Sequence, residues 1–218
     1  MKLKYLLIFG LIFVFTFCSN DPEEDPNELG GDTDISMGTV GNEFSTSVKI
    51  GSNYVDLKED LKISKSEDGI VTIDAKADLS NVPELSELND LIPSSMKDET
   101  GKIKTSIKYK ITSEGIQDYY NDGKKPFTIA KYDCNVGDEY KFTTSDGKKV
   151  TRKVVAKSST DDFSYGFYNI KAISVEQNSN IPGVDKIEYK LNHKFGLVYM
   201  AFVLEDGTKI DSRIYSLY

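Results

Sequence analysis

Histidine and cysteine are scarce in this chain, and their scarcity excludes several kinds of site. Its 218 residues include one histidine, His193, and two cysteines, Cys18 and Cys134. A zinc or iron site built from these side chains needs more of them. The sequence also lacks Gly-x-Ser-x-Gly, Gly-x-Gly-x-x-Gly and Gly-x-x-x-x-Gly-Lys, which removes the usual hydrolase elbow and phosphate loops. We therefore expect no cofactor and no metal, and interpret His193 as a turn residue.

Tryptophan is absent, which weakens the hypothesis of an aromatic platform for sugars. Tyrosine and phenylalanine do occur in two short groups, at 119–120 and 165–168. Neighbouring residues of a strand point to opposite faces, so some ring in each group faces away from the core. Such a ring could stack on a sugar or line an apolar groove, although half-buried rings are also common in strands. The candidate ligand contacts are Tyr119, Tyr120, Tyr165, Phe167 and Tyr168.

The chain also lacks an excess of basic residues over acidic ones. The formal net charge of the whole chain is −8, and residues 19–43 contain eight Asp and Glu with no Lys or Arg. The acidity therefore belongs to this segment, and the rest of the chain is close to neutral. Binding to nucleic acid relies on a basic stripe that faces the phosphates. We expect no nucleic-acid partner.

The amino end has the pattern of an export signal. Lys2 and Lys4 precede an apolar run at residues 6–15. A bilayer-spanning helix needs roughly 20 apolar residues, and this run is shorter. A positive start, a short apolar stretch and a polar exit are typical of a signal peptide. We predict that residues 1–17 are this signal.

Cys18 ends the apolar stretch and is followed by the acidic residues Asp21, Glu23, Glu24 and Asp25. This arrangement resembles the amino end of Bacteroidetes-type surface lipoproteins. The resemblance implies that Cys18 is acylated, and that the membrane is a partner through this lipid anchor at the outer membrane or cell surface. Residues 18–43 are rich in charge, Gly and Pro, so we predict a disordered linker there. The remaining residues, 44–218, form the predicted globular domain.

Phe17 leaves two alternatives to acylation open, because lipoproteins prefer a small residue just before the cysteine. Signal cleavage after Cys18 would release a soluble periplasmic or secreted protein, and an uncleaved signal would itself serve as the anchor. If Cys18 is acylated or removed, Cys134 is the remaining thiol and no internal disulfide can form. We expect Cys134 to be a buried or half-buried strand residue.

Alternation of apolar and polar residues dominates the globular part. It is clear at 71–79, 103–112, 140–144 and 187–191, and it predicts strands with one solvent-exposed face. Asp-Gly pairs, which suit tight hairpin turns, separate such runs. They occur at 68–69, 122–123, 146–147 and 206–207. Parallel strands would need long crossovers, for which the spacing leaves no room after residue 102, so we predict an antiparallel sheet.

Two stretches depart from this alternation. Leu85, Leu88 and Leu91 recur at helical spacing, which predicts one short helix near residues 82–92. Residues 197–204 are apolar at both odd and even positions, so both faces of a strand there would be apolar. This predicts a central strand covered on both faces by the helix or by a fold-back of the sheet. The fold class we predict is mainly β, with a single curved antiparallel sheet. Its element order resembles the LolA/LolB group of lipoprotein carriers, which implies an open half-barrel; a β-sandwich is the alternative.

These features favour a lipid-anchored envelope protein whose β-domain binds an unknown ligand or envelope protein without catalysis. The alternative is a secreted or envelope hydrolase that acts on glycans with a pair of carboxylates. The adjacent Asp161 and Asp162 do not identify such a pair, because neighbouring carboxylates on a strand point to opposite faces. The sequence names no catalytic residue.

Overall fold

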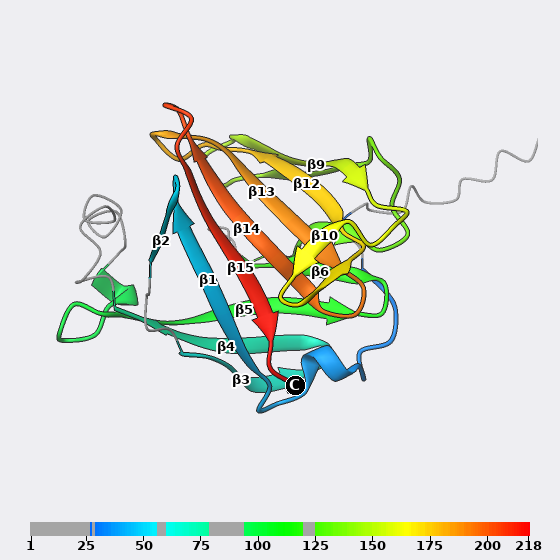
Figure 1. The fold of residues 1–218 in the computed structure, drawn as a ribbon, viewed down its shortest axis with the longest axis horizontal. Helices are drawn as coiled ribbons and strands as arrows, with labels where there is room; N and C mark the ends of the chain where they lie inside the picture. The colour runs from blue at the N-terminus through cyan, green and yellow to red at the C-terminus, as the bar shows by residue number, and fades with distance from the viewer. Residues whose placement is uncertain (1–26, 28, 56–59, 79–93, 120–124) are drawn as a thin grey trace, which may run out of the picture.

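The computed structural model describes residues 27, 29–55, 60–78, 94–119 and 125–218, and the fold below refers to these residues (Figure 1). Their architecture is mainly β: one large antiparallel sheet, a two-stranded hairpin beside it, and two short 3-10 turns. The 3-10 turns are η1 (Ser36–Gly38) and η3 (Ser94–Met96). The prediction of a single curved antiparallel sheet is confirmed. The helix predicted near residues 82–92 lies outside the described residues.

The large sheet consists of two groups of strands. The first group contains β1 (Glu43–Ile50), β2 (Asn53–Val55), β3 (Asp60–Glu67), β4 (Ile70–Ala77), β5 (Ile103–Thr112), β6 (Gly115–Asp118) and β7 (Phe127–Lys131). The second group contains β8 (Glu139–Thr143), β9 (Lys149–Lys157), β12 (Ile173–Asn178), β13 (Val184–Asn192), β14 (Gly196–Leu204) and β15 (Lys209–Ser216). The separate hairpin is β10 (Phe163–Tyr165) and β11 (Tyr168–Ile170).

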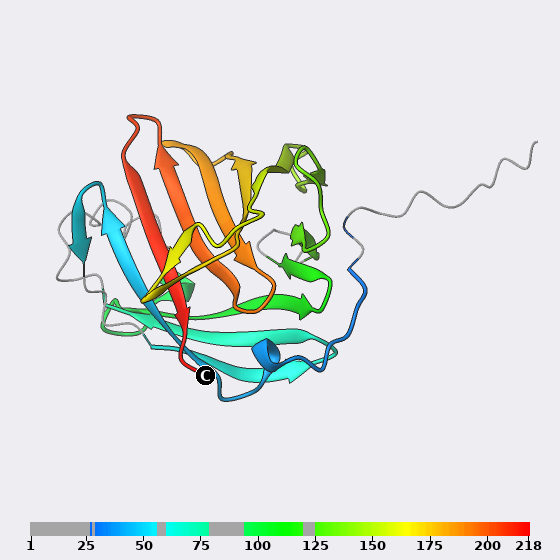
Figure 2. The same ribbon diagram turned by 45° about the vertical axis from the view of Figure 1, so that its right-hand side comes forward.

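The first and last strands of the chain join these two groups. The order across the sheet is β7-β6-β5-β4-β3-β1-β15-β14-β13-β12-β9-β8, with β2 paired to β1. In the β1–β15 pair, Phe44 lies opposite Ser216 and Ile50 opposite Ile210. Figure 2 shows β3, β4 and β5 running across one side of the molecule while β1, β15, β14 and β13 stand steeply against them. The sheet thus curves around an interior and nearly closes into a barrel.

The alternation seen in the sequence explains which residues face this interior. Along β5, Lys104, Ser106 and Lys108 are exposed, whereas Ile103 and Ile107, on the alternate positions, are partly buried. At the β3–β4 turn, Asp68 and Gly69 have φ values of 50° and 76°. A two-residue hairpin turn of type I′ requires positive φ at both central positions, which glycine adopts freely and aspartate tolerates. The hairpin predicted from this Asp-Gly pair is confirmed.

β14 is covered on both faces, as its continuous apolar run predicted. It lies between β13 and β15 in the sheet, and Leu197 and Met200 pack against the main core inside the barrel. On the outer face, Val198 is fully buried beneath Tyr165 and Ile170 of the β10–β11 hairpin. The covering element is therefore this folded-back hairpin.

The two ends of the sheet, β7 and β8, meet at a seam, and a buried ion pair crosses the interior there. Arg152 on β9 donates a hydrogen bond to Asp118 on β6, with Nη2 and Oδ2 2.6 Å apart. It also donates to the carbonyl of Phe127 on β7 at 2.9 Å and to Gln177 on β12 at 2.7 Å. The Arg152 and Asp118 side chains are 3% and 4% exposed. Each charge is therefore compensated, as burial requires.

Asn27 bridges the same seam from outside the sheet. Its Nδ2 donates to the carbonyl of Lys141 on β8 at 2.9 Å, and its Oδ1 accepts from the amide of Thr128 on β7 at 3.3 Å. Its own carbonyl accepts a hydrogen bond from the Gln117 side chain on β6. One residue thus supplies the hydrogen bonds that a further strand would otherwise supply to two open edges.

Residues 29–43, which composition assigned to the disordered linker, pack against the sheet. Leu29 and Met37 are 3% and 5% exposed. The carbonyl of Leu29 accepts a hydrogen bond from Lys110 Nζ at 2.8 Å, and the amide of Ser113 donates to the carbonyl of Asp32 at 2.8 Å. The boundary predicted at residue 43 is therefore corrected, because the apolar side chains of Leu29, Ile35 and Met37 and a few hydrogen bonds hold an otherwise polar segment in place. Residues 18–26 lie outside the described part.

Candidate ligand-binding pocket

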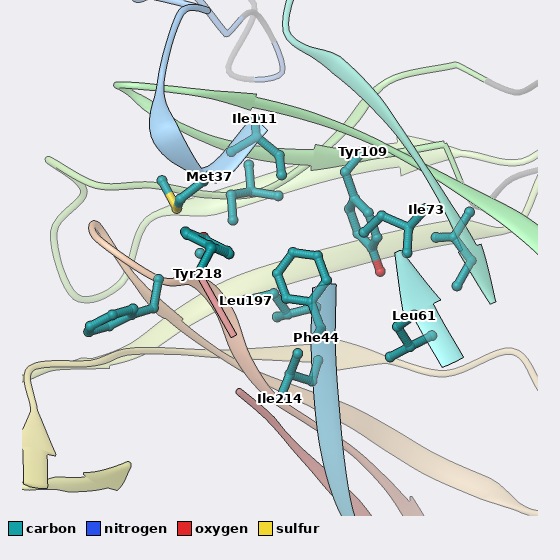
Figure 3. Close-up of a pocket in the computed structure, with 13 residues that line it drawn as sticks. Met37, Phe44, Leu61, Ile73, Tyr109, Ile111, Leu197, Ile214 and Tyr218 are labelled. Carbon is teal, nitrogen blue, oxygen red and sulfur yellow. The ribbon is translucent and has the colours of Figure 1, made fainter. Parts of the chain in front are cut away.

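An apolar pocket opens between the two groups of strands, away from the seam (Figure 3). Its volume is about 100 Å³. The strands β1, β3, β4, β5, β6, β14 and β15 supply most of its lining, and η1, the β13–β14 turn and the C-terminal end supply the rest. The lining residues are Met37, Phe44, Leu61, Ile73, Ile107, Tyr109, Ile111, Ile116, Phe195, Gly196, Leu197, Ile214 and Tyr218.

Strand alternation places these side chains inside. Ile107, Tyr109 and Ile111 are every second residue of β5, so they share its inner face. Ile73 lies opposite Ile107 in the β4–β5 ladder and presents its side chain to the same space. From the other wall, Leu197 on β14 packs against the core. The curvature of the sheet brings these two walls face to face.

A glycine allows the wall of the pocket to pack closely. Gly196, at the start of β14, has a φ of +74°, which favours glycine over residues with a side chain. A Cβ at this position would lie 3.3 Å from Met37 Sδ and 3.5 Å from Ile116 Cδ1. This contact explains how η1, from the amino-terminal segment, closes one side of the pocket.

The chemistry of the pocket is apolar and uncharged. None of the described residues that line it carries a charge, and its side-chain polar atoms are the hydroxyls of Tyr109 and Tyr218. Tyr218 packs edge-on against Phe44, with ring centroids 5.9 Å apart and planes at 87°. Burial raises the pKa of Tyr218 to about 12, so its hydroxyl is neutral at physiological pH. Such a pocket can bind hydrocarbon and offer a hydroxyl, but it provides no general base.

The size of the pocket limits what it can enclose. Pockets for drug-sized molecules measure roughly 300–1,000 Å³, whereas a dry apolar cavity of about 150 Å³ holds benzene. A space of about 100 Å³ therefore suits the end of an alkyl chain or one small apolar side chain.

The aromatic residues singled out in the sequence occupy different environments. Tyr165 is buried, whereas Phe167 and Tyr168 are 108% and 52% exposed. Tyr119, just after β6, is partly buried, and burial raises the pKa of its hydroxyl. Tyr120 lies outside the described residues. The structure therefore brings Tyr165, Phe167 and Tyr168 together on one hairpin, with one ring inside and two outside.

Phe195 connects this hairpin to the pocket. Its ring stacks on Tyr165 with centroids 4.8 Å apart and lies 6.1 Å from the ring of Tyr168. The same residue lines the pocket. Sequence reasoning missed the pocket residues, because the alternation of β5 shows which residues face inward but not which opposing wall they meet.

Groups that could support catalysis lie elsewhere. Asp161 and Asp162 are exposed, and Asp162 Oδ1 accepts a hydrogen bond from Ser158 Oγ at 2.6 Å. His193 is exposed in the β13–β14 turn. Cys134 is buried in the turn after β7 rather than in a strand, and burial raises the pKa of its thiol. Across the described ranges, no cluster of three or more His, Cys, Asp or Glu is arranged to hold a metal ion.

Comparisons with known proteins give a limited picture. No family model matches the chain, and no curated protein matches it. One similar solved structure is a candidate exported protein with a YmcC-like fold from Bacteroides fragilis, with a TM-score of 0.45 and 9% identity over 83% of this chain and 97% of that one. Another is a hypothetical protein from Chlamydia trachomatis, with a TM-score of 0.25 and 10% identity over 81% and 86% of the two chains. In the part of the chain that the structure describes, no helix is long and apolar enough to span a bilayer.

Proposed function

We propose that this protein is a lipid-anchored envelope protein whose β-domain binds the apolar end of a ligand without catalysing a reaction. The observation that carries the binding part is the pocket of about 100 Å³, lined by apolar and aromatic residues from both walls of the curved sheet. The anchoring part rests on the sequence, in which Cys18 follows a short apolar run and precedes an acidic segment. An alkyl chain is the ligand class that this lining matches best.

The absence of charge in the pocket argues for binding over catalysis. Glycoside hydrolysis needs two carboxyl groups that flank one bond, and no described residue that lines the pocket supplies one. Asp118, which is buried, is paired with Arg152 at 2.6 Å. A glycan hydrolase stays an alternative hypothesis, and its test is activity against envelope and dietary glycans.

Ligand binding is tested by fluorescence with dansyl-labelled undecanoic acid added to the purified protein. Saturable enhancement is expected for the unchanged chain. Ile107→Phe places a larger side chain in the pocket and should weaken binding about tenfold or more, because it occupies the space that the alkyl chain needs. Val155→Phe on β9, where the valine is exposed, is the matched control and should bind as the unchanged chain does. Equal binding by both variants, with both shown to be folded by circular dichroism, would remove the pocket as the site.

Anchoring is tested separately by mass spectrometry of the mature protein from the producing cell. A chain that begins at Cys18 and carries acyl groups is expected in the membrane fraction. Cys18→Ala should abolish the acyl mass and shift the protein to the soluble fraction. A mature chain that begins at Ser19 without fatty acid would contradict the anchor and leave the pocket proposal untouched.

A further inference from the structure

Four exposed apolar side chains gather beside the pocket. Phe167 and Tyr168 belong to the β10–β11 hairpin, and Leu217 and Tyr218, which are 63% and 46% exposed, end the chain. The main-chain amide of Ser216 donates to the Tyr165 hydroxyl at 2.9 Å, which ties the segment before Leu217 to the hairpin. A soluble surface normally scatters such side chains singly, and a contiguous group marks an interaction site.

The hairpin is held rigidly, so the exposure of its tip is built into the fold. Gly166, at the first central position of the turn, has a φ of +63°, which a type II′ turn requires. Beside it, the buried Tyr165 stacks on Phe195, and Arg213 Nη1 donates to the carbonyl of Ser164 at 2.8 Å. Phe167 is therefore presented outward by an anchored turn.

Two lysines belong to this part of the surface. The segments 163–172 and 192–196 contain Lys171 and Lys194, both exposed, and no Asp or Glu. They lie next to each other, because Asn192 Nδ2 donates to the carbonyl of Lys171 at 2.8 Å.

Carboxylates also lie at the edge of this surface. Glu43, whose carbonyl accepts from the amide of Leu217, forms an ion pair with Lys62 at 2.8 Å. At the base of the hairpin, Asp161 and Asp162 are exposed, and Asp162 accepts from Ser158. The surface thus combines exposed rings with two lysines, and Asp161 and Asp162 lie near Lys171 at the base of the hairpin.

We propose that this surface, comprising Phe167, Tyr168, Lys171, Lys194, Leu217 and Tyr218, docks on an anionic lipid surface. Tyrosine and phenylalanine rings are suited to the boundary between lipid headgroups and acyl chains, and lysines beside them attract anionic headgroups. Because Phe195 lies between the hairpin and the pocket, docking would place the pocket next to the bilayer. The inference rests on the surface alone and holds whether or not the pocket binds an alkyl chain.

The absence of tryptophan provides a sharp test. Phe167→Trp introduces a single fluorophore at the hairpin tip, and Tyr54→Trp introduces one at another exposed aromatic position on β2, beside Lys49. Both full-length proteins are mixed with vesicles of equal parts phosphatidylglycerol and phosphatidylcholine, and with phosphatidylcholine alone. Anionic vesicles should shift the emission at position 167 to shorter wavelength and make it quenchable by brominated lipid, whereas position 54 should stay exposed to water. Comparing two positions in the same protein separates docking from anchoring, because an anchor brings both probes to the vesicle.

Lysine substitutions test the electrostatic part. Changing Lys171 and Lys194 together to Gln should weaken binding to anionic vesicles about tenfold or more, since each lysine near a charged membrane contributes roughly 1 kcal/mol. The matched control changes Lys104 and Lys108, exposed on the outer face of β5, and should alter binding by about twofold or less.

Three outcomes would overturn the proposal. The two tryptophan positions could respond equally, or neither could respond. The shift at position 167 could also occur without vesicles and grow with protein concentration, which would assign the surface to a second copy of the chain.

Discussion

The interior of the barrel has two parts of opposite character. Near the seam, between β6 and β7 on one side and β9 and β12 on the other, Arg152, Asp118 and Gln177 fill the space with a hydrogen-bonded network. Near the middle of the sheet, between β3–β5 and β14–β15, the interior is apolar and retains an open volume of about 100 Å³. The filled part holds the ends of the sheet together, and the hollow part is available to a ligand.

The largest expected effect comes from breaking the network at the seam. Arg152→Met leaves Asp118 as an uncompensated buried carboxylate, and should lower the free energy of unfolding by about 3–5 kcal/mol. Urea denaturation measures the change. Lys153→Met, at the exposed neighbouring position on β9, should stay within about 0.5 kcal/mol. A loss for Arg152→Met no larger than this control would mean that the seam does not stabilise the barrel.

Truncating apolar residues in the two parts of the interior compares them directly. Ile129→Ala on β7, where the isoleucine is fully buried, should cost about 2–5 kcal/mol because it creates a cavity. Ile107→Ala at the pocket should cost about 1–2 kcal/mol, because this side chain is only partly buried and already borders open space. Urea denaturation of both variants measures the difference. Equal losses would show that the pocket is as tightly packed as the seam.

Alkaline pH should also act on the seam. The hydroxyl of Tyr140 on β8 accepts a hydrogen bond from the amide of Lys131 on β7 at 3.1 Å. Burial raises the pKa of Tyr140 to about 12, above the ordinary value of 10.0. Its contribution to stability is therefore complete below pH 10 and is lost as the pH rises towards 12, by about 1 kcal/mol at pH 11. Urea midpoints at pH 8 and pH 11 measure the loss, and Tyr140→Phe should reduce it; the same loss in Tyr140→Phe would assign the effect to other groups.

The smallest effect concerns the bridge across the two edge strands. Asn27→Ala removes the side-chain hydrogen bonds to Lys141 and Thr128, and should cost about 0.5–1.5 kcal/mol. Hydrogen exchange at the amide of Thr128 should become faster, whereas the amide of Gly207 at the distant β14–β15 turn should keep its rate. Unchanged protection of Thr128 would indicate that Asn27 does not close the seam.

Features that depend on neighbouring residues could be predicted from the sequence, whereas contacts between residues far apart in the chain could not. The alternation in β5 and the Asp68-Gly69 turn are local, and both were predicted correctly. The pairing of β1 with β15 joins Phe44 to Ser216, and no local pattern indicates a contact of that separation. The pocket requires this pairing, so its walls could not be assigned.

The sequence also could not predict the burial and partners of several individual side chains. Composition placed Leu29 in a disordered linker, but its burial depends on contacts with the sheet, near Gly115, that form only on folding. The sequence showed that some ring at 165–168 faces away from the core, and the structure identifies Tyr165 as buried and Phe167 as exposed. No sequence pattern singles out Arg152 or Asp118, because their ion pair forms only when the sheet closes.

The position of β15 between β1 and β14 has a consequence for how the chain reaches its final state. Until this last strand arrives, β1 and β14 each present an unpaired edge, and such edges readily recruit other chains. Because the β1–β15 pairing joins residues far apart in the sequence, it is expected to be a slow, late step. A nascent or shortened polypeptide that stops before Lys209 would leave those edges open and should aggregate.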